Sequence, residues 1–238
     1  MTAAARLELV ALDAPDIESL ASFYAELAGG EVVRKVPDWI TVRLLSGQEI
    51  AFQRAPDHVA PQWPGQEQPQ QFHLDLLVDG HEAAAERAVQ LGATRLADGP
   101  TWITLADPAG HPFDLCQRDG TGPAMELFAV TLDAGDAAAL AHFYADLLEL
   151  EVSYEGPEGA LVSGGPTSLM VQQISGYNAP QWPDPSRPQQ AHLDILVDDL
   201  DAGEKRALSL GAARLDGGGA TFRVFADPAG HPFCLTAG

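Results

Sequence analysis

The sequence has few basic residues, few cysteines and no long apolar run. Of its 238 residues, 13 are Lys or Arg and 34 are Asp or Glu, which gives a formal net charge of −21. A surface of that sign repels nucleic-acid phosphates and anionic lipid headgroups. No apolar segment approaches the roughly 20 residues that cross a bilayer, and the first six residues contain no signal-peptide core. We therefore expect a cytoplasmic protein with no nucleic-acid or membrane partner.

The two cysteines, Cys116 and Cys234, are too few for a disulfide framework. They occupy different positions of the internal repeat described below, and reduced thiols are the ordinary state in the cytoplasm. A hydrophobic content of 46% with 20% charged residues is that of a soluble globular protein, and the length suffices for one large domain or two ordinary ones.

The chain is a tandem duplication. The pair Phe23-Tyr24 recurs 120 residues later (143 − 23), and the Pro-Gln-Trp-Pro motif at 61–64 recurs 119 residues later (180 − 61). Asp-Pro-Ala-Gly-His-Pro-Phe at 107–113 recurs after 120 residues (227 − 107). Because order and spacing are kept over the full length, we predict two domains. Their expected bounds are 1–120 and 124–238, with a polar Gly/Pro connector at 119–123.

A strand with one polar face occurs once in each half. At 72–78, branched apolar residues alternate with a set that includes His73 and Asp75, which is typical of a half-buried β-strand. Residues at i and i+2 of a strand point to the same face, so the histidine and the aspartate share one side. The repeat places His192 and Asp194 in the same relation.

Around these strands, each half is predicted to contain two successive modules, each made of a strand, a helix and three further strands. Apolar spacing predicts helices near 16–27 and 83–91, and near 136–148 and 201–210 in the second half. In the first half, strands are expected near 7–12, 31–36, 40–44, 49–53, 70–79, 93–96, 102–106 and 112–117. The segment at 55–71, rich in Pro and Gln, is a connector.

These features resemble the vicinal oxygen chelate superfamily, which contains glyoxalases, bleomycin-resistance proteins, fosfomycin-resistance enzymes and extradiol dioxygenases. The resemblance rests on the helix with Phe23-Tyr24, the His73-Leu74-Asp75 strand, the motif at 107–113 and their second copies. It implies an α+β fold of two tandem glyoxalase-like domains, each a pair of βαβββ modules curling into an open cup. Such a fold supports many reactions and does not fix one.

Metal-using members of the superfamily hold a divalent ion in the cup with side chains from the first and last strands of each module. Carried onto this sequence, the first-strand position is Leu9 or Ala129, neither of which is a ligand, so the set is incomplete. The remaining metal candidates are Gln53, His73 and Asp114 in the first half and Gln172, His192 and Cys234 in the second. The resemblance thus leaves two alternatives, no cofactor or a divalent ion such as Zn, Mn, Fe or Ni.

His73 and His192 are the candidate catalytic residues. Each could hydrogen-bond within a polar pocket and orient a ligand, bind a metal, or act as a general acid or base. Trp63 and Trp182, on the long connectors, could cap an apolar pocket or fix the loop to the domain. The candidate ligand-binding residues are Gln53, Trp63, Asp75, Asp114, Gln172, Trp182, Asp194 and Cys234.

Two function classes follow from the resemblance. The first is a protein that binds a small, partly hydrophobic metabolite or natural product in each cup without a complete metal site. The second is a metal-dependent glyoxalase-like lyase, isomerase or dioxygenase acting on a small oxygenated substrate. In either case the partner is a small molecule, and the protein is expected to be a monomer or a homodimer.

Overall fold

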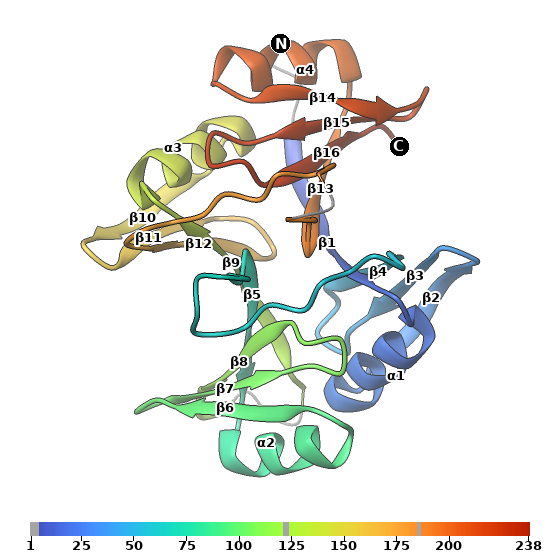
Figure 1. The fold of residues 1–238 in the computed structure, drawn as a ribbon, viewed down its shortest axis with the longest axis vertical. Coiled ribbons are helices and arrows are strands. Elements are labelled where there is room, and N and C mark those ends of the chain that lie inside the picture. Colours follow the sequence, from blue (N-terminus) through green and yellow to red (C-terminus); the bar gives the residue numbers. More distant parts are fainter. Residues whose placement is uncertain (1–4, 121–123, 185–186) are drawn as a thin grey trace.

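The computed structural model describes residues 5–120, 124–184 and 187–238. Within these ranges the chain forms sixteen strands and four helices, arranged as two eight-stranded mixed sheets (Figure 1). The α+β class and the twice-repeated βαβββ order in each half are confirmed. Part of the expected connector at 119–123 lies outside the described residues, and the domain bounds 1–120 and 124–238 stay a prediction. None of the described helices is long and apolar enough to cross a membrane.

The elements of the first half end where its connectors and turns begin. They are β1 (Ala5–Ala14), α1 (Ile17–Ala28), β2 (Glu31–Val36), β3 (Trp39–Arg43), β4 (Glu49–Arg54), β5 (Phe72–Val78), α2 (His81–Gln90), β6 (Thr94–Asp98), β7 (Trp102–Ala106) and β8 (Pro112–Gln117). The second half repeats the order. Its elements are β9 (Glu126–Ala134), α3 (Ala137–Leu148), β10 (Glu151–Gly156), β11 (Gly159–Ser163), β12 (Ser168–Gln173), β13 (Ala191–Val197), α4 (Leu200–Ser209), β14 (Ala213–Gly218), β15 (Phe222–Ala226) and β16 (Pro232–Thr236).

Local sequence explains where the first helix of each half begins and ends. The Asp16 carboxylate accepts a hydrogen bond from the Ser19 backbone N–H at 3.0 Å and so caps α1. Gly29 ends α1 in the left-handed conformation at φ 69°, which glycine adopts without steric cost. Asp136 caps α3 in the same way, through Ala139 N–H at 3.0 Å. The duplication thus preserved the N-terminal cap, whereas Glu149, at φ 56°, takes the place of Gly29 at the end of α3.

Each helix packs on the last strands of its own module. Helix α1 contacts β3 and β4, α2 contacts β7 and β8, α3 contacts β11 and β12, and α4 contacts β15 and β16. The apolar faces of these strands therefore meet a helix. The opposite face of each sheet carries the polar members of the alternation, His73 and His192 among them, and is left to form a cup.

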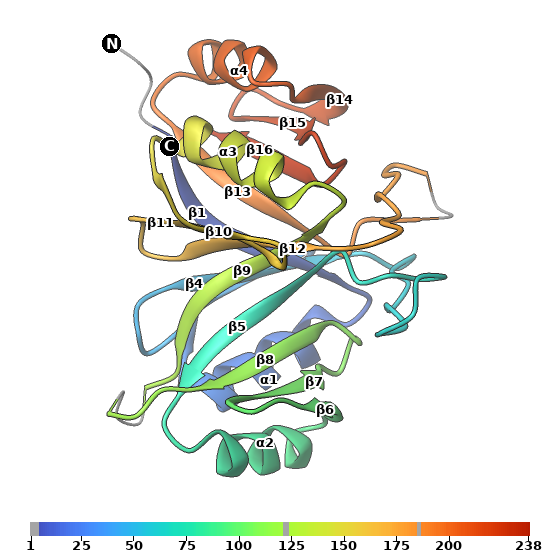
Figure 2. The same cartoon turned by 90° about the vertical axis from the view of Figure 1, so that its left-hand side faces the viewer.

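The two sheets exchange modules between the halves (Figure 2). One sheet joins β1–β4 to β13–β16 through the antiparallel pair β1 and β13, and the other joins β5–β8 to β9–β12 through β5 and β9. Two cups built from pairs of βαβββ modules are therefore present, but the expectation that each half closes its own cup is wrong. Eight residues separate β8 from β9, whereas seventeen separate β4 from β5. The short link keeps the second and third modules in one sheet, and the long connector crosses to the other.

A reciprocal clasp joins the two long connectors where they meet. Gln71 donates its backbone N–H to Oε1 of Gln190 at 2.9 Å, and Gln190 donates its N–H to Oε1 of Gln71 at 3.0 Å. The two side-chain amides donate to the carbonyls of Pro188 and Pro69 at 2.8 and 2.9 Å. Both glutamines are buried. Each connector thus satisfies the polar backbone of the other, which holds the two sheets together at their centre.

Candidate functional site: two composite cups

Each sheet encloses one cup on its helix-free face. The first cup, on the sheet of β5–β12, has a volume of about 580 Å³, and the second, on the sheet of β1–β4 and β13–β16, has about 710 Å³. Both volumes lie in the range of small-molecule pockets. Because every sheet takes one module from each half, both halves line both cups.

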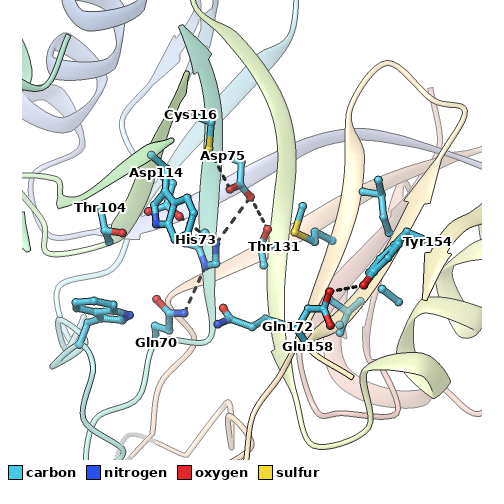
Figure 3. Close-up of a pocket in the computed structure, with 17 residues that line it drawn as sticks. Gln70, His73, Asp75, Thr104, Asp114, Cys116, Thr131, Tyr154, Glu158 and Gln172 are labelled. Atoms are coloured by element: carbon cyan, nitrogen blue, oxygen red, sulfur yellow. Dashed lines mark hydrogen bonds and ion pairs between the residues drawn. The ribbon is translucent and has the colours of Figure 1, made fainter. Parts of the chain in front are cut away.

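The floor of the first cup carries an imidazole between two carboxyl groups (Figure 3). His73 Nε2 lies 3.8 Å from Oδ2 of Asp75, its neighbour on the same face of β5, and 4.0 Å from Oδ2 of Asp114 on β8. Asp75 also accepts hydrogen bonds from the hydroxyl of Thr131 and, at 3.8 Å, from the thiol of Cys116. The alternation predicted from sequence therefore brings these groups together.

Asp114 is the least satisfied group on this floor. Its Oδ1 is buried and has no hydrogen-bond partner among the described residues. Burial raises the pKa of its carboxyl, while the neighbouring His73 and a hydrogen bond from Thr104 act to lower it. A buried acceptor without a partner is costly, so a hydrogen-bond donor on a ligand would be stabilised at this oxygen.

Aromatic and aliphatic side chains form the walls of the first cup. They come from the connector, from β7 and from the module of the other half, and they are Trp63, Trp102, Tyr154, Leu161 and Met170. Gly159, at the start of β11, lets this strand pair closely with β12: its φ is 157°, and a Cβ there would lie 2.1 Å from the Val171 carbonyl oxygen. A polar floor with apolar walls suits a ligand that has a polar end and a hydrophobic body.

The second cup has the same plan with different chemistry. His192 Nε2 lies 3.5 Å from Oδ1 of Asp194, and Cys234 on β16 stands where the first cup has Asp114. Burial lowers the pKa of His192 to about 4 and raises that of Asp194 to about 7, so the imidazole is neutral at neutral pH. Burial also raises the pKa of the Cys234 thiol, which leaves it protonated.

The second cup also contains cationic side chains, which the first lacks among its described lining residues. Arg34 and Arg43 line it; the Arg34 guanidinium stacks over Trp39 at 5.9 Å from the ring centre, and Arg43 pairs with Glu49 at 2.8 Å. Arg34 partly offsets the rise in the pKa of Asp194 that burial causes. The two cups are therefore electrostatically distinct and suit different ligands.

The donor sets predicted from the halves are regrouped by the module exchange. Gln172 lines the first cup with His73 and Asp114, whereas Gln53 lines the second cup with His192. Of each set expected within one half, the histidine stays with Asp114 or Cys234, and only the glutamine lies in the other cup. Asp75 and Asp194, ligand-binding candidates on the same strand face, complete the two groups.

The register of the sheets shows which first-strand residues pair with the histidines. His73 pairs with Thr131, and His192 pairs with Ala11. Ala129 and Leu9, the positions carried over from the superfamily, pair with the aspartates two residues farther along and so lie diagonally across from the histidines. Only the pairing register, which no short motif encodes, reveals this.

The tryptophans divide between the cups. Trp63 and Trp102 line the first cup, and Trp39 lines the second. Trp182, the twin of Trp63, is absent from the described linings of both cups and stays a ligand-binding candidate on sequence grounds only.

One buried network was missed by the sequence reasoning. Gln70 donates its side-chain amide to Asp133 Oδ1 at 3.1 Å and lies 3.4 Å from His73 Nδ1. The second copy links Gln189 to Asp13 Oδ2 at 2.8 Å. A signal was present, since Gln-Gln precedes the histidine by three and two residues in both copies, but the aspartate comes from the opposite half and only the fold brings it near.

A second missed network explains the repeated motif at 107–113. Asp107 accepts hydrogen bonds from the Tyr24 hydroxyl at 3.0 Å, from His111 Nδ1 at 3.0 Å and from two backbone N–H groups of its own turn. The neighbouring carboxylate outweighs burial and raises the pKa of His111. All three side chains are buried. The network joins helix α1 to the last turn of the next module and has no access to the cups.

Comparison with known proteins agrees with this architecture. A family model described as "Glyoxalase-like domain" matches residues 9–116 and again 129–236. The chain therefore belongs to the glyoxalase-like family, in the vicinal oxygen chelate superfamily, with two tandem domains. A search of curated protein sequences finds no match.

Solved structures show the same fold over nearly the whole chain. Glyoxalase I from Zea mays is 18% identical, covers 99% of this chain and 93% of its own, and superposes with a TM-score of 0.68. A protein from Bacillus subtilis provisionally described as a dioxygenase is 13% identical, covers 97% of this chain and 84% of its own, and has a TM-score of 0.65. At these identities the likeness shows the fold alone.

The residues present fit a divalent ion in spacing. One ligand atom each from His73, Asp75 and Asp114 lies within 4.8 Å of the others, and the same holds for His192, Asp194 and Cys234. All three members of each group come from one module, and the opposite module adds a neutral glutamine amide to the cup. In each group the histidine Nδ1 also lies 3.4–3.5 Å from the side-chain amide nitrogen of a glutamine.

Proposed function

We propose that the first cup binds a small, partly hydrophobic metabolite or natural product, with its polar end against His73 and Asp114 and its body between the aromatic walls. The observation that carries this proposal is the cavity of about 580 Å³, which combines aromatic walls with a buried polar floor. Most ligand sites are mainly apolar pockets in which a few polar groups fix the orientation.

The charge of the lining narrows the ligand. Asp75, Asp114 and Glu158 line the first cup, and none of its described lining residues is Lys or Arg. An anionic ligand would be repelled by these carboxylates and by the net charge of −21. We therefore infer that the ligand of the first cup is neutral or cationic. Arg34 and Arg43 in the second cup permit a ligand that carries a carboxylate there.

A metal-dependent lyase, isomerase or dioxygenase is the second candidate function. The specific observation in its favour is the spacing of His73, Asp75 and Asp114, since two carboxylates and an imidazole suit a divalent ion. A bound ion would supply Lewis-acid chemistry to a substrate oxygen. The protein groups would hold that substrate between the walls of the cup and exclude water from it.

Binding of the fluorescent ketone prodan tests the first proposal. Prodan is neutral and aromatic and carries one carbonyl acceptor. Trp102→Ala removes an aromatic wall, and a contact of about 0.5–1.5 kcal/mol corresponds to a roughly two- to tenfold loss of affinity. Leu208→Ala, an equally exposed apolar position on α4 outside both cups, is the control. Equal prodan affinity in wild type and Trp102→Ala would refute binding in this cup.

A further inference from the structure

We propose that Gln70 with Asp133, and Gln189 with Asp13, are positioning residues that fix each cup histidine with its proton on Nε2. Each cup then presents an imidazole N–H donor to its ligand. This inference deepens the proposed function, because it names the ligand chemistry that the histidines recognise. It also decides which of the two candidate functions the cup is prepared for.

The first step concerns the orientation of the Gln70 amide. In its ionised form the Asp133 carboxylate can only accept, and its Oδ1 lies 3.1 Å from Gln70 Nε2, so the amide nitrogen faces this oxygen. The same nitrogen lies 3.4 Å from His73 Nδ1. An amide nitrogen has two N–H donors and no lone pair that accepts a hydrogen bond. One hydrogen is used by Asp133, and the other points toward the ring.

The second step concerns the ring. A nitrogen that accepts a hydrogen bond in a neutral imidazole has no proton, so His73 Nδ1 is bare and the proton is on Nε2. The other side of the ring gives the same answer. Nε2 faces Oδ2 of Asp75 at 3.8 Å and Oδ2 of Asp114 at 4.0 Å. An N–H is attracted to these oxygens, whereas a lone pair there would be repelled.

The second cup repeats the arrangement independently. Gln189 Nε2 lies 2.8 Å from Oδ2 of Asp13 and 3.5 Å from His192 Nδ1. His192 Nε2 faces Oδ1 of Asp194 at 3.5 Å. The two cups differ in their walls and in their third polar residue. They nevertheless share this Asp–Gln–His chain of hydrogen bonds, which we call the relay.

The relay is buried and crosses between the halves. The side chains of Asp13, Asp133, Gln70 and Gln189 are all buried, with residue exposures of 2–6%. In each copy the aspartate belongs to one half and the glutamine and histidine to the other. The connectors are held in place by the backbone as well: Asp133 N–H donates to the Gln71 carbonyl at 3.1 Å, and Asp13 N–H donates to that of Gln190 at 2.9 Å.

Two consequences follow for the ligand. An N–H at Nε2 binds an oxygen acceptor, and the carboxylates beside it disfavour an anion in the first cup. The geometry therefore points to a neutral oxygen acceptor, such as a carbonyl or ether oxygen, at the polar end of that ligand. A protonated Nε2 is also not a metal ligand. A metal could bind through this atom only if the imidazole proton moved to Nδ1 and the Gln70 amide turned its oxygen toward it.

Long-range ¹H–¹⁵N NMR of histidine-labelled full-length protein without ligand tests this assignment, because it distinguishes Nε2–H from Nδ1–H tautomers. His73→Ala and His192→Ala identify the two signals among the seven histidines. We expect the Nε2–H pattern for both residues. An Nδ1–H pattern for either one would overturn the proposal for that cup.

Gln70→Glu tests whether the glutamine sets the tautomer. The new carboxyl keeps the size of the amide but presents an acceptor to Nδ1, so His73 is expected to change to the Nδ1–H pattern. His192 in the same protein is the internal control and should keep its pattern. A His73 that stays Nε2–H would overturn the positioning role. Should this variant fail to fold, Gln189→Glu makes the same test on His192 in the other cup.

These outcomes are distinguishable from failure of the proposed function. The tautomers are measured without ligand, whereas prodan binding tests the cup itself. Prodan binding with Nδ1–H histidines would refute the relay alone. Nε2–H histidines in a protein that does not bind prodan would refute the proposed function alone.

Discussion

Replacing Gln71 by alanine should destabilise the protein through loss of the connector clasp. The substitution removes the acceptor of the Gln190 N–H and the donor to the Pro188 carbonyl. Gln190 is 4% exposed, so its N–H is left without a partner away from water, at a cost of about 1–3 kcal/mol. The Pro188 carbonyl is partly buried and can regain water, so its loss costs roughly 0.5–1 kcal/mol. We expect a total of about 1.5–4 kcal/mol.

Urea unfolding followed by circular dichroism measures this loss. Gln90→Ala, at the exposed end of helix α2, is the matched control and should lie within about 0.5 kcal/mol of wild type. Gln190→Ala should resemble Gln71→Ala, because the clasp is reciprocal. A Gln71→Ala protein as stable as Gln90→Ala would refute the view that the clasp holds the two sheets together.

Three further predictions concern metal, assembly and pH. Protein purified without chelators should contain less than one metal ion per chain by elemental analysis. One or more tightly held ions would overturn the proposal that the cups bind their ligands without a complete metal site. Because one chain supplies all four modules of two cups, light scattering should give the mass of a monomer; a stable large oligomer would count against this. Burial raises the pKa of Asp13 from 3.8 to about 7, so the folded state holds this proton more tightly and wild-type stability falls between about pH 4 and 7. Asp13→Asn lacks that loss, so in urea unfolding its stability relative to wild type should be higher at pH 8 than at pH 5, by at most about 2.6 kcal/mol. A smaller advantage at pH 8 than at pH 5 would contradict the assignment.

Much of the fold was predictable because the signals that specify it are local. Alternation identified the strand of His73 and its twin, and the repeat identified two tandem copies. The exchange of modules was not predictable in the same way. It depends on which strand edges pair, and it follows from the eight-residue link between β8 and β9 compared with the seventeen-residue connector between β4 and β5.

The candidate site was predictable only in part for the same reason. His73 and Asp75 were expected on one face, since two residues of one strand need no tertiary information. Thr131, the residue that pairs with His73, was not predicted, because the register of β5 against β9 is a long-range property. Asp133 could not be found from sequence, because it reaches Gln70 from the other half of the chain.

The central claim, that the first cup holds a ligand oxygen against the His73 N–H, is tested most directly by calorimetric titration of prodan into wild type and His73→Ala. Loss of one hydrogen bond of about 0.5–1.5 kcal/mol predicts a roughly two- to tenfold larger dissociation constant for the first cup. The circular dichroism spectrum of the folded protein should be retained. His192→Ala should leave the affinity of that cup unchanged, because this residue lies in the second cup. Equal affinities in wild type and His73→Ala would contradict the account.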